Sequence, residues 1–289
     1  YTFVVSSLLT DAMSISSSYT SLTMGSLGTL SAGTDFGGVS YMYDEEVPQA
    51  YEQMSDAQQT TANRIGSIGD TNAIVYNSPS FDLGGVTAKV DLGYTAGANS
   101  GNANDGGSSA PDDNFGSQTD AGLTLSYDAL KVGVYGADIE RTSGGDATDA
   151  FEGTWYANYS FGPVSVGYTE SYMDTGANGA AEAVTAAKTE GTANVRTANG
   201  FFEGEQMSVA FNVNENLSIS YTESEETYDA QDDAATAVAD VTQKVSGMQA
   251  AYSMGAMSIK AYRLDIENPA FDSDASDKTA TEIALGLAF

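Results

Sequence analysis

Carboxylates are the most abundant side chains in this sequence that could do chemistry. The chain of 289 residues carries 40 Asp and Glu against 10 Lys and Arg, a formal net charge of −30, and it contains no His and no Cys. This balance disfavours nucleic acid as a partner, because phosphate binding requires basic patches. The lack of His and Cys removes imidazole catalysis, thiol chemistry and disulfides.

No catalytic motif accompanies these carboxylates. Paired carboxylates occur throughout the chain, so their presence does not single out an acid–base pair. The chain has no Gly-x-Ser-x-Gly elbow on a strand–helix turn and no phosphate-cradling loop, and without His it cannot build a Ser-His-Asp triad. We therefore expect no enzymatic activity and no cofactor.

One acidic segment, residues 37–72, differs from the rest of the chain. Five of its carboxylates lie within thirteen residues, namely Asp44, Glu45, Glu46, Glu52 and Asp56. Within it, residues 49–63 lack Gly and Pro and are predicted to form a short helix. In bulk water this segment is an ordinary solvated loop. Inside a narrow lumen the same carboxylates attract cations, because low-dielectric walls focus their field.

The rest of the chain predicts β-hairpins whose connections alternate between short and long. Short turns occur at Ser26-Leu27, Asp82–Gly85, Asp128-Ala129, Gly162-Pro163, Asn214–Asn216 and Gly255-Ala256. The other connections are long and acidic, and they span residues 97–116, 141–150, 174–198, 229–241 and 268–277. This alternation places every long loop at one end of the strands, as in outer-membrane barrels.

The strands alternate apolar and polar residues. In Val86–Tyr94 the valines, Leu92 and Tyr94 share one face, whereas Lys89 and Asp91 share the other. The last strand repeats the pattern, with Ile283, Leu285, Leu287 and Phe289 on one face and Glu282 on the other. A barrel with lipid outside and water inside uses both kinds of face. We count about 14 strands. The chain contains no apolar run of about 18 residues, so no transmembrane helix is predicted.

Aromatic residues form two bands along these strands. We interpret them as anchors at the two membrane interfaces, although ordinary β-propensity also favours Tyr and Phe. The interface set is Phe81, Tyr94, Tyr127, Phe161, Tyr168, Tyr262 and Phe289.

Residues 14–289 resemble the general-diffusion porins of Gram-negative bacteria, most closely the alphaproteobacterial type. Three stretches carry the resemblance: the hairpin Tyr19–Gly33, the stretches Asn63–Ile65 and Ile74–Phe81, and the terminal Phe289. They look like the strand pair before the family's constriction loop, the strand that leaves this loop, and the C-terminal signal for membrane insertion.

The resemblance implies an all-β fold, a transmembrane antiparallel β-barrel of 16 strands, in one domain over residues 1–289. It implies that residues 37–72 fold into the lumen as the constriction loop. It further implies a homotrimer in the Gram-negative outer membrane that passes small hydrophilic solutes by diffusion. Because Tyr1 begins in mid-strand, we expect the family's N-terminal hairpin to be missing from this sequence.

Basic residues are too few to balance the acidic segment. We hypothesise that Arg64, Lys89, Lys131 and Lys260 form the basic side of a field across the pore. Alternatively, each merely solvates the lumen wall or pairs with a neighbouring carboxylate, and such a pair stabilises the protein little where it is exposed.

The carboxylates Asp112, Asp113, Asp232 and Asp233 could act as weak Ca²⁺ ligands. Alternatively, they belong to solvated loops, because no EF-hand spacing is present.

The sequence therefore predicts a passive, cation-preferring diffusion channel that contacts the lipid bilayer. One alternative is a substrate-selective outer-membrane channel of the same architecture. Another, from a different class, is a secreted β-repeat adhesin or surface-layer protein.

Overall fold

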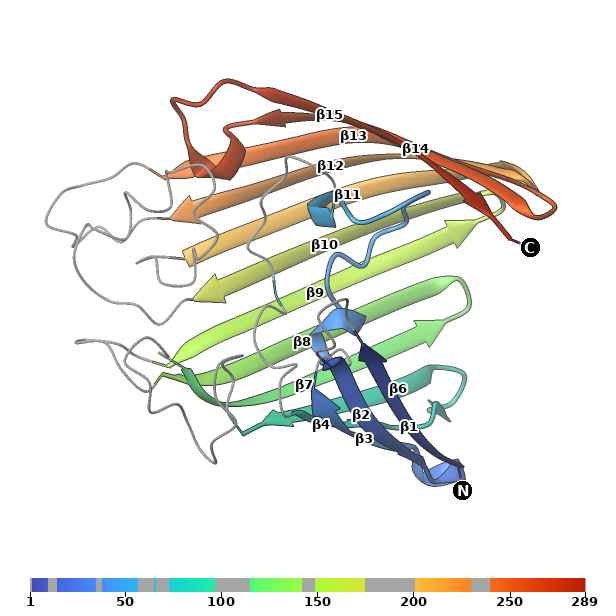
Figure 1. Cartoon of the computed structure of the whole chain (residues 1–289), viewed down its shortest axis with the longest axis vertical. Helices are drawn as coiled ribbons and strands as arrows, with labels where there is room; N and C mark the ends of the chain where they lie inside the picture. Colours follow the sequence, from blue (N-terminus) through green and yellow to red (C-terminus); the bar gives the residue numbers. More distant parts are fainter. Residues whose placement is uncertain are drawn as a thin grey trace, which may run out of the picture. The chain divides into compact units, whose positions relative to one another are not determined.

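The computed structural model describes residues 2–9, 15–34, 38–56, 65, 73–96, 115–141, 149–174, 201–229 and 240–288. Their regular structure consists of β-strands and short 3₁₀ turns (Figure 1). None of the helical turns in these ranges is long and apolar enough to cross a membrane. The sequence-based prediction of an all-β chain is confirmed.

Residue contacts group the chain into two units. The first unit comprises Tyr1–Asp44, Ile65–Trp155 and Asp174–Asn178, and the second comprises Glu45–Arg64, Tyr156–Met173 and Gly179–Phe289.

The first unit is an antiparallel sheet in which strands pair in chain order. β5 is a two-residue branch that pairs only with β6. The strands are β1 (Thr2–Leu9), β2 (Ile15–Thr23), β3 (Thr29–Thr34), β4 (Ala73–Asn77), β5 (Phe81–Asp82), β6 (Thr87–Thr95), β7 (Phe115–Tyr127), β8 (Leu130–Arg141) and the first half of β9 (Ala150–Phe161).

The second unit continues in the same manner from the second half of β9. Its strands also follow chain order, and those from β11 to β15 pair antiparallel with unbroken register over most of their length. They are β10 (Val164–Asp174), β11 (Phe201–Asn214), β12 (Leu217–Asp229), β13 (Val241–Met254), β14 (Met257–Glu267) and β15 (Lys278–Leu287).

The strand order holds fourteen strands besides the β5 branch, in agreement with the sequence-based count. Among the described pairings, β1 and β15 each have one hydrogen-bonded neighbour. The predicted short turns are all present. Three of them open on a residue with left-handed φ, namely Asp128 (53°), Gly162 (59°) and Gly255 (59°). Such residues match the twist of a tight hairpin, so these positions fix the register of the flanking strands.

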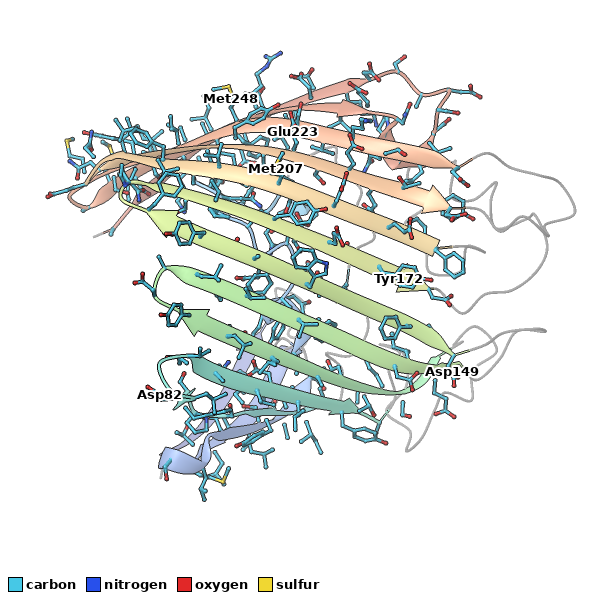
Figure 2. The ribbon with its side chains drawn as sticks, turned by 180° about the vertical axis from the view of Figure 1, so that it is seen from behind. Asp82, Asp149, Tyr172, Met207, Glu223 and Met248 are labelled. Carbon is cyan, nitrogen blue, oxygen red and sulfur yellow. The ribbon has the colours of Figure 1, made fainter. Side chains whose placement is uncertain are left out.

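The sheet of the second unit has an apolar face that is open to the surroundings and a polar face that is covered. We call them the open face and the covered face. On the open face Val209, Met248 and Ile283 are 43%, 66% and 74% exposed. On the covered face Gln206, Ser220 and Gln249 are almost fully buried. Figure 2 shows Met207, Glu223 and Met248 projecting from the open face.

The first unit has the same two kinds of face. Leu92 and Tyr94 are exposed on its open face, whereas Asp91 and Asp120 are buried on its covered face. The alternation predicted for Val86–Tyr94 is therefore confirmed from Val90 onward. A soluble sheet would bury its apolar face instead, so this arrangement fits contact of the open face with lipid.

Adjacent residues of β11 test which face meets lipid. We predict that Phe211→Lys, on the open face, destabilises the protein by about 2–4 kcal/mol if it lies near the bilayer midplane and by less near an interface. Asn212→Lys, with the parity of the covered face, is the matched control and should change stability little. Urea unfolding of the protein folded into lipid vesicles measures both variants. Equal effects would contradict the assignment of the faces.

Candidate functional site

The acidic segment lies on the covered faces. Residues 38–44 pack within the first unit, and Glu45–Asp56 pack within the second. Figure 1 shows the second part as a light blue trace near the label of β11. For the described residues 38–56, the alternative of a fully solvated loop is therefore wrong.

Tyr43 anchors the segment in the first unit. Its side chain is fully buried, and its hydroxyl donates a hydrogen bond to Asp91 Oδ2 at 2.8 Å. Its ring stacks on Tyr135 with a centroid distance of 5.7 Å. The aromatic contact and the charge-assisted hydrogen bond together hold this part of the segment against β6 and β8.

Asp91 is buried as a carboxylate because it has three partners. Besides the Tyr43 hydroxyl, Asn77 Nδ2 donates to Asp91 Oδ1 at 2.7 Å, and Lys89 Nζ lies 2.8 Å from the same oxygen. A buried charge is tolerated when it is paired in this way. The structure thus favours, for Lys89, the alternative of pairing with a neighbouring carboxylate.

Gly122 makes room for Tyr43. It lies opposite Asp91 on β7, and a Cβ at this position would come within 2.3 Å of the Tyr43 ring. Rigid ring atoms cannot give way by that much, so a larger residue here is incompatible with the observed position of Tyr43.

Strand side chains hydrogen-bond to the backbone of the segment in the second unit. Asn158 Nδ2 of β9 donates to the Glu46 carbonyl at 2.9 Å, and the Ser208 hydroxyl of β11 donates to the Pro48 carbonyl. Gly167 of β10 leaves space for the Pro48 ring, because a Cβ there would lie 2.3 Å from Pro48 Cδ. The segment is fixed across several strands.

Further along, β12 and β13 hold the backbone. The Ala50 N–H donates to Ser220 Oγ at 2.9 Å, and the Tyr51 N–H donates to Gln249 Oε1 at 2.9 Å. Gln249 Nε2 in turn donates to the Glu52 carbonyl at 2.7 Å. Residues 49–53 have no helical backbone, so the predicted helix over 49–63 is wrong for 49–53. Only Met54–Asp56 form a 3₁₀ turn, and 57–64 lie outside the described residues.

Tyr51 ties the segment to the last two strands. Its hydroxyl donates to Glu282 Oε1 of β15 at 2.6 Å, and Lys260 Nζ of β14 lies 5.3 Å from the centre of its ring. The hydrogen bond to Glu282, followed by burial and the charge of Glu52, raises the pKa of Tyr51 to about 12. The tyrosine therefore remains a neutral donor at physiological pH. Lys260 lies beside the acidic segment.

Four carboxylates of this segment line one cavity of about 420 Å³, namely Glu45, Glu46, Glu52 and Asp56. Burial raises the pKa of Glu52, with further contributions from the charges of Glu282 and Asp56. Burial likewise raises the pKa of Asp56, and the charge of Glu45 adds to it. No Lys or Arg occurs between Glu45 and Asp56, so this stretch of the segment presents only negative charge.

The other predicted charged residues fall in different places. Asp44 is half-buried in the first unit, next to Tyr43 in the chain, and Lys131 is half-buried in β8. Arg64 lies outside the described residues, as do Asp112, Asp113, Asp232 and Asp233. Within the described ranges, no group of three or more carboxylates is placed to hold a metal ion. A role for calcium stays an untested prediction.

Most of the predicted interface aromatics are accessible. Phe81, Tyr94, Tyr127 and Phe161 are exposed, and Tyr168 is half-buried with its hydroxyl donating to Glu170 at 2.7 Å. The membrane role of these residues stays a prediction, and Phe289 lies outside the described residues.

The prediction is wrong for Tyr262. Its side chain is 2% exposed and packs on the covered face with Met54 and Leu264. Lys260 precedes it by two positions and therefore shares its face, so the two predictions for β14 were incompatible.

The sequence did not reveal the packing of residues 268–272, which were expected to form a polar external loop. Phe271 is fully buried, with ring centroids 5.3 Å from Phe202 and 6.5 Å from Tyr228. Gln243 Oε1 accepts a hydrogen bond from the Ala270 N–H at 2.8 Å. The Pro-Ala-Phe triplet inside an otherwise polar loop is the one signal that could have indicated this.

Comparison with known proteins identifies the fold. No protein-family model and no curated protein matches the chain. Solved structures do. The anion-selective porin from Comamonas acidovorans is 14% identical with a TM-score of 0.65, and the match covers 96% of this chain and 80% of that one. The chain has the fold of outer-membrane porins.

Two further structures support this fold. OmpF of Salmonella typhi, in complex with daunomycin, is 10% identical with a TM-score of 0.60 and coverages of 94% and 78%. The outer membrane channel DcaP of Acinetobacter baumannii is 11% identical with a TM-score of 0.54 and coverages of 94% and 73%. At this identity the likeness establishes the porin fold alone.

The space at Gly122 provides a test of how the segment is held. Val39 is fully buried in the segment, and the chain has no native cysteine. We predict that a V39C variant resists a water-soluble maleimide, and that adding Gly122→Leu makes it react at least tenfold faster because Tyr43 is displaced. Gly136→Leu is the control, since a Cβ there makes only ordinary contacts, the nearest at 3.7 Å. Equal labelling rates in all three proteins would contradict the anchoring role of Tyr43.

Proposed function

We propose that the protein is a passive diffusion channel of the Gram-negative outer membrane for small hydrophilic solutes, and that it prefers cations. The porin fold supports the general part of this proposal. The cation preference rests on one observation: Glu45, Glu46, Glu52 and Asp56 share a cavity in a segment that strand side chains hold in place.

The physical basis is the electrostatics of a narrow aqueous passage. Carboxylates on low-dielectric walls raise the local concentration of cations and lower that of anions. Lys89 contributes little opposing charge because Asp91 pairs with it at 2.8 Å. Lys260 opposes the acidic segment with a single charge. The Comamonas porin is anion-selective, so in this proposal selectivity differs between channels of one fold.

Reversal potentials under a salt gradient test the preference. We predict that the native channel is cation-selective in planar bilayers, and that E52Q with D56N lowers the cation-to-anion permeability ratio by roughly twofold or more. The double variant E215Q with D128N removes two carboxylates from hairpin turns and should leave the ratio unchanged. Anion selectivity of the native channel would contradict the proposal. Saturable flux of one solute would indicate a substrate-selective channel instead.

The raised pKa values of Glu52 and Asp56 predict an unusual pH dependence. A raised pKa means that these groups become neutral at a higher pH than ordinary carboxyls, which titrate near about 4. Cation selectivity should therefore decline as pH falls, beginning above the ordinary carboxyl range. E52Q with D56N should remove this early part of the decline. Reversal potentials across a pH series measure it, and the same profile in native and variant channels would assign the selectivity to other groups.

Assembly as a homotrimer is part of the same proposal. Its expected signature is conductance that appears and closes in steps of three, together with heat-modifiable migration on gels. Single, independent steps would indicate a monomeric channel.

A further inference from the structure

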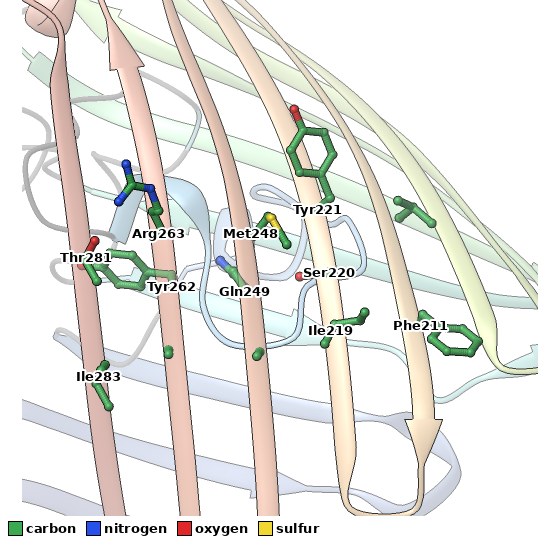
Figure 3. Close-up of a pocket in the computed structure, with 13 residues that line it drawn as sticks. Phe211, Ile219, Ser220, Tyr221, Met248, Gln249, Tyr262, Arg263, Thr281 and Ile283 are labelled. Carbon is green, nitrogen blue, oxygen red and sulfur yellow. The ribbon is translucent and has the colours of Figure 1, made fainter.

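A hollow interrupts the open face of the second unit. It has a volume of about 460 Å³, within the range of roughly 300–1,000 Å³ typical of ligand pockets. Figure 3 shows it between β11 and β15, with Phe211, Ile219 and Ile283 nearer the hairpin ends than Tyr221, Met248 and Arg263.

Two small residues form the floor of this hollow. The strand registers place one cross-strand row on the open face, in the order Phe211, Ile219, Ala250, Ala261 and Ile283. Large apolar side chains stand at both ends of the row, and two alanines lie side by side in its middle. The next row on the hairpin side contains the large residues Tyr252, Ile259 and Leu285.

The positively charged side chain of Arg263 lies at the opposite edge of the hollow. The next row toward the long loops runs Val209, Tyr221, Met248, Arg263 and Thr281. Arg263 is 67% exposed, and its ion pair with Asp265 is loose at 3.8 Å. A guanidinium has five N–H donors in a fork that fits two phosphate oxygens, so Arg263 retains donors for a second anion.

We propose that this hollow binds one phosphate-bearing membrane lipid. The acyl chain lies over Ala250 and Ala261, and the phosphate accepts hydrogen bonds from Arg263. The site adds a lipid-binding function to the porin fold and does not depend on the solute preference of the channel.

Charge and position together favour this occupant. In the porin fold the open face meets lipid, so an acyl chain is present at the hollow. Arginine at the edge of an apolar band extends its charged end toward the headgroups. Beyond this row the open face turns acidic, with Glu223 and Asp265 in the next row. These carboxylates repel a phosphate, so Arg263 marks the level at which it can bind.

Tryptophan quenching by brominated lipid tests the proposal. The chain has a single tryptophan, Trp155 in β9, so W155F with L285W yields one reporter beside the hollow. The intact protein in detergent micelles is titrated with phosphatidylglycerol that carries brominated acyl chains, and separately with brominated diacylglycerol. We expect phosphatidylglycerol to quench at about tenfold lower mole fraction, the effect of one charge-assisted phosphate contact.

Three variants of the reporter protein separate the parts of the site. R263Q should bring the two lipids to equal potency, and A250L with A261L should abolish quenching at low mole fraction by filling the hollow. A157L makes one such Ala→Leu change on the open face of β9, away from the hollow, and should leave both titrations unchanged.

Equal potency of the two lipids in the native-sequence reporter, or no effect of R263Q, would overturn the proposal. A second copy of the chain seated on the hollow would also overturn it. That outcome would appear as protection of the oligomer from both lipids, relieved on dissociation into monomers. Channel selectivity is measured separately, so failure here leaves the proposed function untouched.

Discussion

The hydrogen bonds between covered-face side chains and the backbone of Glu45–Asp56 determine how the second unit is arranged. Apart from the apolar cluster in which Met54 packs with Tyr262 and Leu264, the covered face is polar, so most of the attachment comes from directed contacts. Ser220 and Gln249 supply them, and Gln249 alone accepts from the Tyr51 N–H and donates to the Glu52 carbonyl. These contacts use peptide groups, so they hold the backbone of the segment without occupying the carboxylates of Glu52 and Asp56. Its carboxylates are thereby left to line a cavity.

Glycines complement these hydrogen bonds by setting how closely the segment approaches. Gly122 accommodates the Tyr43 ring in the first unit, and Gly167 accommodates Pro48 in the second. In a strand interior glycine weakens the sheet, and such positions mark the close approach of another group. Small residues also leave space on the open face. There Ala250 and Ala261 form a hollow that no segment of the described chain fills.

Much of this fold could be predicted because strand periodicity and turn chemistry are local. The alternation in Val86–Tyr94 and the short turns at Asp128 and Gly162 correctly indicated an all-antiparallel sheet. The contacts of the acidic segment could not be predicted, because they join residues far apart in sequence. A helix over 49–53 was expected from the absence of Gly and Pro. The backbone there is not helical, and Gln249 binds the Tyr51 N–H and the Glu52 carbonyl. The aromatic bands predicted an interface position for Tyr262. Strand alternation places Tyr262 on the same face as Lys260, and this is the face on which it is found.

Docking and charge are linked in the acidic segment. Attachment to the covered face removes Glu52 and Asp56 partly from water, which raises the pKa of each. A raised pKa means that the docked segment binds protons more tightly than a detached one would. The charges therefore oppose docking above the raised pKa values, and this opposition disappears below the ordinary carboxyl range. At neutral pH the backbone hydrogen bonds and the Tyr51–Glu282 contact must offset it. The negative charge of Glu52 and Asp56 that would favour cations is thus maintained by backbone hydrogen bonds and by the Tyr51 hydroxyl, which stays protonated.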